Sequence, residues 1–198
     1  MTAGRHRSFN KDNALEKAMI VFWQNGYTGT SLTDLTSAMG INKPSLYSAF
    51  GNKEELFNQA IALYLEKHGL IHSALLINDQ QGLMDRLTNY LLSIAQMLTD
   101  KNLPKGCLLC NSTTEVAGSR LPDNSSAEVS SINQQTVAFL TDFFENEKLA
   151  GNYAPKHESE TMANYLLALQ FGLAVSARNG SDMKELTRII DFSVGSFN

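Results

Sequence analysis

The chain has 198 residues, 43% of them hydrophobic, and a formal net charge of −4. This length is enough for one large or two small domains with a buried core. No apolar run reaches the roughly 18 residues that span a bilayer, and the segment MTAGRHRSFNKD lacks the hydrophobic stretch of a secretory signal. Two cysteines are too few for a disulfide framework. We therefore expect a cytoplasmic protein with no membrane partner.

The charge is unevenly distributed along the chain. Residues 1–53 contain six Lys or Arg and three Asp or Glu, which leaves +3 in that part and −7 in the remainder. Such asymmetry suggests two functions in one chain, with the basic part directed at an acidic partner such as nucleic acid. Random scatter in a small sample is the simpler alternative.

Helical spacing of apolar residues dominates the sequence, and no stretch alternates well enough for a strand. We therefore predict an all-α protein. The first helix begins after the N-cap residue Asn10 and ends at Gly26. The second begins at Ser31 and Asp34, which have the spacing of a capping box, and ends at Gly40.

Further helices follow directly. Asn42 caps a short third helix with Pro44 in its first turn, where proline costs little, and Asn52 with Glu55 starts a longer fourth helix. Breaks rich in Gly, Pro, Asn and Asp separate later helices, predicted at about 82–100, 106–117, 125–148, 158–178 and 182–197. The predicted domains are a three-helix N-terminal domain, residues 1–55, and a helical C-terminal domain, residues 56–198.

The second and third helices meet at the turn SAMGIN, and together they indicate a helix-turn-helix. Leu46 and Phe50 anchor the third helix, and no acid occurs from Leu35 to Lys53. Small, hydrogen-bonding side chains without acids suit the floor of a DNA major groove. A plain three-helix packing unit is the alternative, but its exposed face would more often carry Glu–Lys pairs.

The block TGTSLTDLTSAMGINKPSLYSAFGNKEELF closely resembles the N-terminal DNA-binding domain of TetR/AcrR-type transcriptional regulators. These proteins share a Thr-rich second helix, a Gly at the turn, a Lys-x-(Ser/Thr)-Leu-Tyr recognition helix and a following Lys-Glu. Beyond this block the resemblance is architectural. It implies a C-terminal ligand-binding and dimerisation domain, and a function as a DNA-binding transcriptional regulator, which we expect to be a repressor.

The resemblance also implies which residues contact DNA. Lys43 and Pro44 would meet base edges, since a lysine can donate to guanine and a proline ring can lie on a thymine methyl. Tyr47 and Lys53 match positions that usually contact phosphates, as does Ser31 or Thr30 at the start of the second helix. Thr33 stands where some members place a base-reading Arg. The full candidate set is Thr30, Ser31, Thr33, Lys43, Pro44, Ser45, Tyr47, Ser48 and Lys53.

The segment KGCLLCNSTTE places Cys107 and Cys110 one helical turn apart, which leaves several interpretations open. A thioredoxin-like redox pair needs a βαβ setting, and the sequence shows no strands. A zinc site would need His68 and His72, which are also one turn apart. These four residues define the alternative function, an α-helical thiol or metal-dependent enzyme. As small apolar side chains, the two cysteines could also be plain packing.

The remaining interpretation is a sensor cysteine. Cys107 follows Lys105 and Gly106 at a predicted helix start, where the helix dipole and a cation could lower a thiol pKa. The GCL segment also resembles that of the electrophile-sensing repressors of the family, and Arg178 is a candidate cationic neighbour. Because no phosphate loop, carboxylate pair or nucleophile with an oriented base accompanies these residues, we predict a regulator with no cofactor, and not an enzyme.

The resemblance places an effector pocket among the C-terminal helices. Its expected occupant is an unknown small molecule, or an oxidant or electrophile acting at Cys107 and Cys110. Aromatic and apolar residues at helical spacing are candidates for the lining, although such residues are more often plain core. These candidates are Tyr64, Tyr90, Met97, Leu109, Phe139, Phe143 and Phe171.

The segment 158–178 is apolar almost all round from Met162 to Val175, so it must be covered on two sides. We predict that a second copy covers one side, in a twofold interface shared with segment 182–197. The residues expected there are Leu166, Leu169, Gln170, Leu173, Ala177, Met183, Leu186, Ile190, Val194 and Phe197. Such a homodimer would hold two recognition helices one turn (~34 Å) of double-stranded DNA apart and would bind a palindromic operator.

Overall fold

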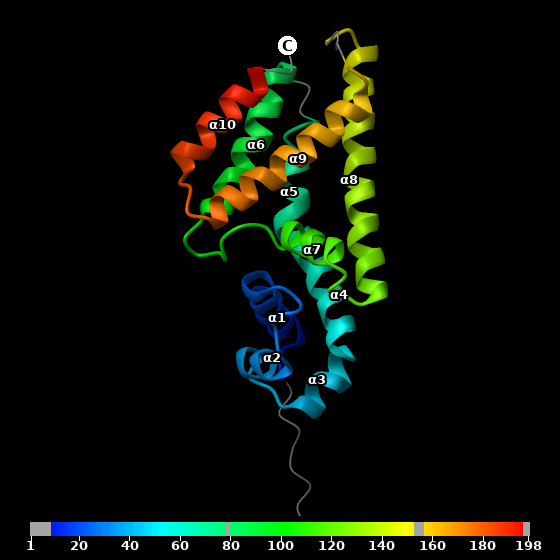
Figure 1. The fold of residues 1–198 in the computed structure, drawn as a ribbon, viewed down its shortest axis with the longest axis vertical. Helices are drawn as coiled ribbons and strands as arrows, with labels where there is room; N and C mark the ends of the chain where they lie inside the picture. Colours follow the sequence, from blue (N-terminus) through cyan, green and yellow to red (C-terminus); the bar gives the residue numbers. More distant parts are fainter. Residues whose placement is uncertain (1–8, 78–79, 153–156, 196–198) are drawn as a thin grey trace, which may run out of the picture.

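The structure is a computed structural model that describes residues 9–77, 80–152 and 157–195. Every regular element in these ranges is a helix, which confirms the all-α prediction. Figure 1 shows an elongated molecule with α1–α3 at one end, here called the head, and α5–α10 at the other, here called the body. The head contains α1 (Lys11–Asn25), α2 (Leu32–Met39) and α3 (Lys43–Phe50), and α4 (Lys53–Tyr64) runs from the head into the body.

The head begins and ends its helices where the capping residues predict. The side chain of Asn10 caps α1, and that of Asn42 caps α3. Complete capping boxes start α2 at Ser31 and α4 at Asn52. Gly40, at the helix-turn-helix turn, has the left-handed conformation with φ 70°, which a side chain would strain. The local signals therefore fix this part of the fold.

The core of the head continues along α4. Leu46 and Phe50 are buried, as predicted, and hold α3 against the other helices of the head. Phe57 of α4 packs edge-on against Phe22 of α1, with ring centroids 5.1 Å apart. The same cluster of buried residues includes Leu108 of α7, so the head is joined to the body by packing and not by a flexible linker.

The fourth helix differs from its prediction. The α-helical hydrogen bonding stops at Tyr64, a π-helical turn follows at Leu65–Gly69, and α5 (Leu70–Ser73) completes the rod. A π-helical turn accommodates an extra residue and shifts the side chains that follow, and it often occurs at functional sites. Apolar spacing does not reveal such a turn. The positions of His68 and His72 depend on it.

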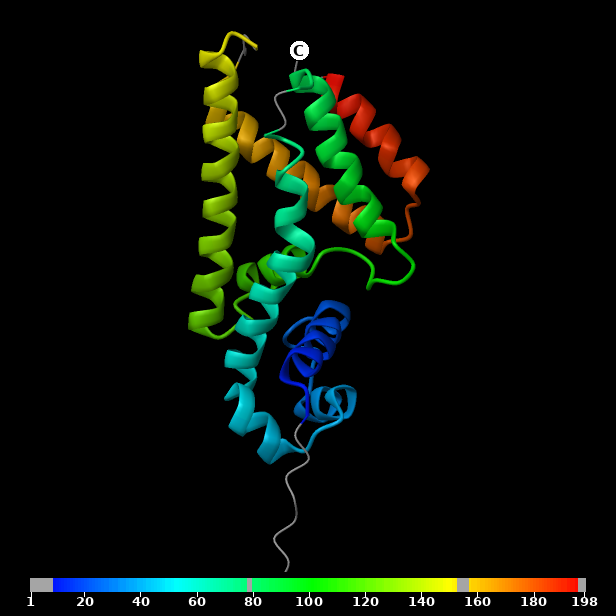
Figure 2. The same cartoon turned by 180° about the vertical axis from the view of Figure 1, so that it is seen from behind.

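The body is built from longer helices: α6 (Leu83–Thr99), α7 (Leu108–Ala117), α8 (Asp123–Leu149), α9 (Ser159–Arg178) and α10 (Met183–Gly195). Their bounds lie within two residues of the predicted ones; the predicted end of the last helix, with Phe197, lies outside the described residues. The helix α9 packs on α6 and α8, and α10 packs on α6 (Figure 2). The short helix α7 contacts α1, α4 and α9 and so lies where head meets body (Figure 1).

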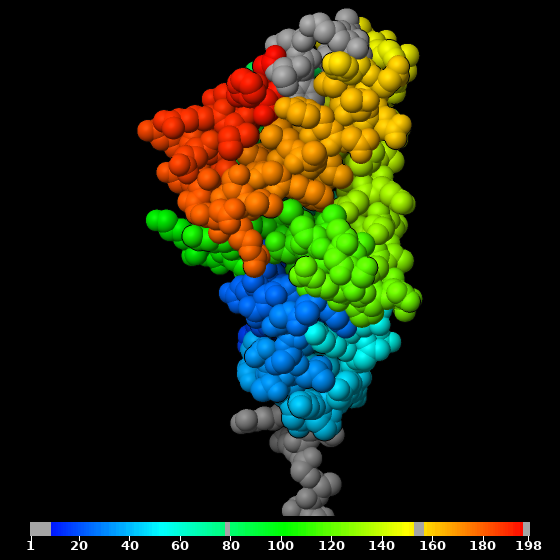
Figure 3. Space-filling view, in the orientation of Figure 1, coloured from blue at the N-terminus to red at the C-terminus, as the bar shows by residue number. Residues whose placement is uncertain are grey.

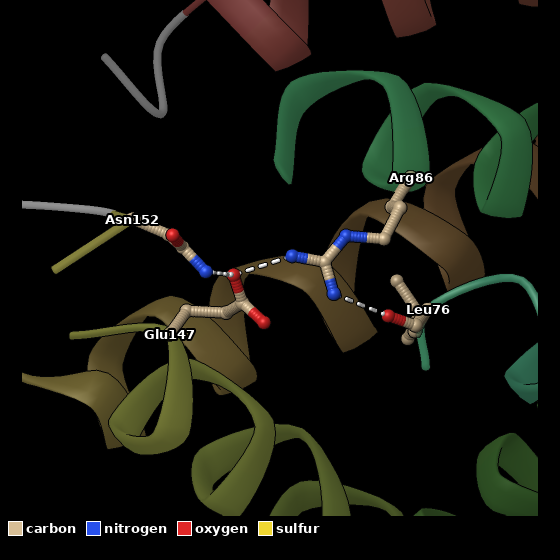
Figure 4. Close-up of polar contacts among 4 residues, drawn as sticks. All are labelled: Leu76, Arg86, Glu147 and Asn152. Carbon is tan, nitrogen blue, oxygen red and sulfur yellow. Dashed lines mark hydrogen bonds and ion pairs between the residues drawn. The ribbon is translucent and has the colours of Figure 1, made fainter. Parts of the chain in front are cut away.

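A buried ion pair joins α6 to α8 at the far end of the body (Figure 4). Arg86 is 4% exposed and donates hydrogen bonds to the carboxylate of Glu147 and, at 2.9 Å, to the carbonyl oxygen of Leu76. Asn152 donates to the same Glu147 oxygen at 3.1 Å. The arrangement ties three separate chain segments together, with the guanidinium 5.5 Å from the ring of Phe143.

Candidate nucleic-acid interface and body cavity

The outward face of α3 lies at the tip of the head, away from the body (Figure 1). Lys43, Pro44, Tyr47 and Ser48 are exposed there, and Ser45 is half-buried. The helix carries no acidic residue. A cation and a hydroxyl-rich surface are therefore available to bases and phosphates.

The start of α2 adds to this face, with one correction. Ser31 and Thr33 are exposed beside α3. The Ser31 hydroxyl also donates to the Asp34 carboxylate at 2.6 Å, as part of its capping box. Thr30 is only 2% exposed, and its hydroxyl donates to the carbonyl oxygen of Gly26 at 2.6 Å. Its side chain supports the turn after α1 and is not available for the predicted phosphate contact.

Lys53 at the start of α4 lies over an aromatic ring. Its ammonium nitrogen is 4.1 Å from the ring centroid of Tyr27, a cation–π contact. Burial lowers the pKa of Lys53, and the nearby Glu115 carboxylate raises it in part. Lys53 therefore connects the start of α4 to the turn between α1 and α2.

The carboxylate of Glu115, on α7 in the body, binds the turn between α1 and α2. Its two oxygens accept hydrogen bonds from the backbone N–H groups of Tyr27, at 2.9 Å, and Thr28, at 2.8 Å. Gly26 has φ 71°, and a Cβ built there would lie 3.1 Å from both carboxylate oxygens. No sequence signal indicates this contact, because 87 residues or more separate its partners.

A second connection joins α1 to the residues around Cys107. The indole N–H of Trp23 donates to the carbonyl oxygen of Gly106 at 3.0 Å. Arg178 of α9 donates to the carbonyl oxygen of Gln24 at 3.1 Å, at the C-terminal end of α1. The predicted cationic neighbour of the cysteines thus also binds the head. A movement of α7 or α9 would therefore displace α1 through these two hydrogen bonds.

A cavity of about 120 Å³ lies between the end of α4, the π-helical turn, α5, α6, α7 and α9. Six of the residues predicted for an effector site line it: Tyr64, Tyr90, Met97, Cys107, Leu109 and Phe171. His68, His72 and Gln170 line it as well. The apolar spacing identified five of the 18 lining residues, and it did not identify these three polar residues as part of the wall.

Three other candidates lie elsewhere. Phe143 is buried beneath Arg86, and Phe139 is partly exposed on α8; neither lines the cavity. Cys110 is buried, with its sulfur 3.9 Å from the carbonyl oxygen of Phe171. Burial raises the pKa of Cys110 to about 12, so this thiol stays protonated near neutral pH.

Cys107 forms the N-cap of α7 and faces the cavity. The Tyr64 hydroxyl donates to its sulfur at 3.2 Å. Cys107 is half-buried, and desolvation raises the pKa of its thiol, whereas the hydrogen bonds from Tyr64 and from the backbone of α7 lower it in part. The expectation of a lowered thiol pKa is therefore wrong, because desolvation outweighs the hydrogen bonds to the sulfur.

The predicted dimer residues mostly lie inside the chain. Leu166, Leu173, Ala177, Leu186, Ile190 and Val194 are buried in the body core, and Leu169, Gln170 and Met183 are half-buried. A different face of the same two helices is exposed, here called the apolar stripe. It consists of Tyr165, Ala168, Gly172, Val175, Ile189 and Phe192. Figure 3 shows α9 and α10, in orange and red, over the upper part of the viewed surface.

The described residues also bear on two other kinds of site. They contain no group of three or more His, Cys, Asp or Glu side chains placed to hold a metal ion. Among the helices of these residues, none is long and apolar enough to cross a membrane.

Comparison with known proteins identifies the family. Residues 14–60 match the sequence model for bacterial regulatory proteins of the tetR family. The HTH-type transcriptional repressor ComR of Escherichia coli (strain K12) is 32% identical over 188 residues, covering 94% of this chain and 88% of ComR. The chain belongs to the TetR family. The predicted family and the prediction of a DNA-binding transcriptional regulator are thereby confirmed.

Solved structures of TetR-family proteins share the whole fold. A cysteine mutant of the transcriptional regulator CifR, complexed with a 26-base-pair operator DNA, superposes with a TM-score of 0.86. It is 30% identical, and the match covers 98% of this chain and all of that one. The reduced form of Escherichia coli NemR superposes with a TM-score of 0.80 over 94% of this chain at 20% identity, which shows the fold alone. The TetR architecture therefore extends through the body.

Proposed function

We propose that the protein is a repressor that binds a palindromic operator as a homodimer and is released by a small electrophile at Cys107. Residues 1–55 would bind DNA, and residues 56–198 would bind the effector and the second copy. The observation that carries the proposal is the direct connection between the two parts: Trp23 of the head is hydrogen-bonded to Gly106, next to Cys107 in the cavity wall. Such a regulator acts where the DNA is, in the cytoplasm.

Contact with DNA would centre on the exposed, acid-free face of α3. ComR is named a repressor, and CifR has been solved with its operator, which supports the same function here. Lys43 is the only cation within α3, so it is the side chain best suited to donate to a base edge from this helix. Tyr47 lies on the same face and can position the helix through a phosphate.

We expect Lys43→Ala to weaken specific operator binding by about 1–3 kcal/mol, because one base contact is lost. The operator would first be selected from genomic DNA fragments, and binding then measured by fluorescence anisotropy over a range of salt concentrations. Lys101→Ala is the matched control, since it removes the same charge from an exposed site in the body. No sequence preference in the wild-type protein, or an equal loss in both variants, would contradict the proposal.

Dimerisation would use the apolar stripe. Gly172 lies in its centre, and a Cβ built on this residue meets nothing within 4 Å in the chain. Packing within one chain therefore does not explain a glycine in the middle of a 20-residue helix, where it costs about 0.5–1 kcal/mol relative to alanine. Close approach of a second α9 does explain it. A second copy of the chain, related by twofold symmetry, is the proposed occupant of this surface.

Release from DNA would begin at Cys107. An adduct on its sulfur must occupy part of the cavity and replace the hydrogen bond from Tyr64. Both neighbours of the cysteine lead to the head: Gly106 accepts from Trp23, and the Tyr64 ring packs edge-on against the Trp23 indole at 4.8 Å. A coupling free energy of about 1–3 kcal/mol between adduct and operator would suffice for regulation.

The thiol chemistry favours an electrophile that enters the cavity over a general oxidant. A thiol whose pKa is raised by burial has little thiolate near neutral pH, and the thiolate is the reactive form. Reaction at Cys107 then depends on binding beside it. Cys110 cannot serve as a ready partner for a disulfide, because its pKa is about 12.

We expect the alkylated wild-type protein to bind operator about five- to 150-fold more weakly, and Cys107→Ser to resist the effect. Alkylation by iodoacetamide should rise with pH through and above the ordinary thiol pKa, since burial raises that of Cys107. Mass spectrometry gives the extent of reaction, and anisotropy gives the DNA affinity. Cys110→Ser is the control and should keep the response. A Cys107→Ser protein that releases DNA like the wild type would rule out this sensor.

We also infer that the chain is not an enzyme. The side chain bonded to the Cys107 sulfur is Tyr64, a hydrogen-bond donor and not a general base. His72 instead has its Nδ1 atom 2.7 Å from the Ser93 hydroxyl. The geometry thus does not assemble the nucleophile and oriented base that a thiol enzyme requires.

A further inference from the structure

Two polar atoms in the wall of the cavity have no hydrogen-bond partner. They are Nε2 of His72 and the amide nitrogen of Gln170, and each has almost no accessible surface of its own. His72 as a whole is only 4% exposed. Leaving a buried polar group unpaired costs about 1–3 kcal/mol, so such groups usually indicate a missing partner. Both atoms belong to the same cavity as the Cys107 sulfur.

Both groups can donate a hydrogen bond to a ligand. Burial lowers the pKa of His72, whereas a hydrogen bond to the His68 backbone raises it in part, and the net lowering favours a neutral ring. A ligand oxygen would select the tautomer with its hydrogen on Nε2, in which Nδ1 accepts from the Ser93 hydroxyl at 2.7 Å. The Gln170 amide lies beside Tyr90, whose pKa burial raises to about 12 and the amide lowers in part, and an amide nitrogen has a second hydrogen to donate to a ligand. Two neutral donors, and no fixed charge, suit an uncharged acceptor such as a carbonyl oxygen.

We propose that the cavity binds a small α,β-unsaturated ketone or aldehyde, with its carbonyl oxygen on His72 and Gln170 and its β-carbon toward Cys107. This inference rests on the proposed function and specifies its ligand. The cavity measures about 120 Å³. An apolar cavity of about 150 Å³ holds one benzene molecule, so a ring of five or six atoms is the largest body expected to fit. Leu98, Leu109 and Phe171 supply the apolar walls.

The chemical step is addition of the thiol across the carbon–carbon double bond. A bond forms between the Cys107 sulfur and the β-carbon, the π bond breaks, and the thiol proton ends on the α-carbon. No oxidant or reductant is needed. Negative charge develops on the carbonyl oxygen during the addition, and donors aimed at that oxygen stabilise it. A reagent without a carbonyl gains nothing from His72 or Gln170.

The test compares two thiol reagents on the full-length protein without DNA: 2-cyclopentenone, and methyl methanethiosulfonate, which has no carbonyl. Intact-mass spectrometry follows the rate at Cys107 in a Cys110→Ser background. We expect Gln170→Leu and His72→Phe each to slow the cyclopentenone reaction about three- to tenfold. Neither should change the methyl methanethiosulfonate rate more than about twofold. Gln96→Leu, the same change at an exposed site of α6, should leave both rates unaltered.

Equal slowing of both reagents, or no slowing of either, would overturn the proposal. A binding measurement keeps the test decisive where a variant folds poorly. Cyclopentanone cannot alkylate, and its binding to the Cys107→Ser protein should change the fluorescence of Trp23, the only tryptophan, which packs on Tyr64 and His68. Cyclopentane should bind about tenfold more weakly; equal binding would refute the carbonyl contacts.

The result of this ligand test can be distinguished from the result of the test of the proposed function. The alkylation rates report only on the cavity, whereas release is read from operator affinity after alkylation. Selective alkylation that leaves operator affinity unchanged would refute the regulatory proposal and keep the binding site. Release of DNA after alkylation that His72 and Gln170 do not influence would refute the binding site for the carbonyl and keep the regulatory proposal.

Discussion

A Phe192→Asp protein is expected to be monomeric and to lose about 10²–10⁴-fold in operator affinity. Phe192 is 84% exposed on α10 and is the most exposed large apolar side chain of the apolar stripe. A carboxylate there would be buried against its twofold partner without a counter-charge. Each head would then bind its half-site alone, without the effective concentration that a dimer provides. Analytical ultracentrifugation gives the oligomeric state, and anisotropy with a full operator gives the affinity.

Leu149→Asp is the matched control. Leu149 is 82% exposed at the end of α8 and is not part of the apolar stripe, so this change should leave both dimer and affinity intact. Gly172→Leu tests the same interface by placing a large side chain on the exposed side of α9. Space around Gly172 within one chain is open, so the monomer should fold normally while close approach of a second α9 is blocked. A dimeric Phe192→Asp protein with normal affinity would show that the stripe is not the interface.

Local signals explain how much of the head could be predicted. Asn10, Ser31, Asn42 and Asn52 cap their helices as expected, because capping depends only on neighbours three residues away. The exposed face of α3 follows from its two buried anchors. Thr30 was misplaced because the resemblance gives a position in the sequence, and the turn after α1 decides which way its hydroxyl points.

The proposed dimer face depends on information that apolar spacing cannot supply. A helix that is apolar nearly all round has a period but no unique inward side, so the sequence does not indicate which side of α9 faces the chain's own core. The structure buries Leu166 and Leu173 within the chain and leaves Ala168, Gly172 and Val175 outside. The small residues Ala168 and Gly172 distinguish the outer side of α9 from the inner side, but apolar spacing depends only on large apolar residues.

The cavity and its connection to the head depend on distant contacts. Glu115 meets Tyr27 across 88 residues, and Trp23 meets Gly106 across 83. No local pattern encodes such pairs. The pKa of Cys107 was predicted in the wrong direction for a related reason: the helix start is visible in the sequence, whereas the desolvation that outweighs it comes from other helices.

An Arg86→Met protein is expected to be less stable than the wild type by about 3–5 kcal/mol in the free energy of unfolding. The substitution keeps a side chain of similar length, but among the described residues it leaves the buried Glu147 carboxylate with the Asn152 amide as its remaining hydrogen-bond donor. The carbonyl oxygen of Leu76 loses its donor as well. Urea unfolding followed by circular dichroism, at one fixed protein concentration, measures the change.

Two further variants separate the cost of an unpaired charge from the loss of the interaction itself. The double variant Arg86→Met, Glu147→Leu removes both charges and should recover most of the lost stability, because an apolar pair can replace a buried ion pair. Lys148→Met breaks the exposed pair with Glu145, 3.6 Å apart, and should change stability by less than about 1 kcal/mol. A double variant as unstable as Arg86→Met alone would mean that the ion pair itself, and not the relief of a buried charge, holds α6 to α8.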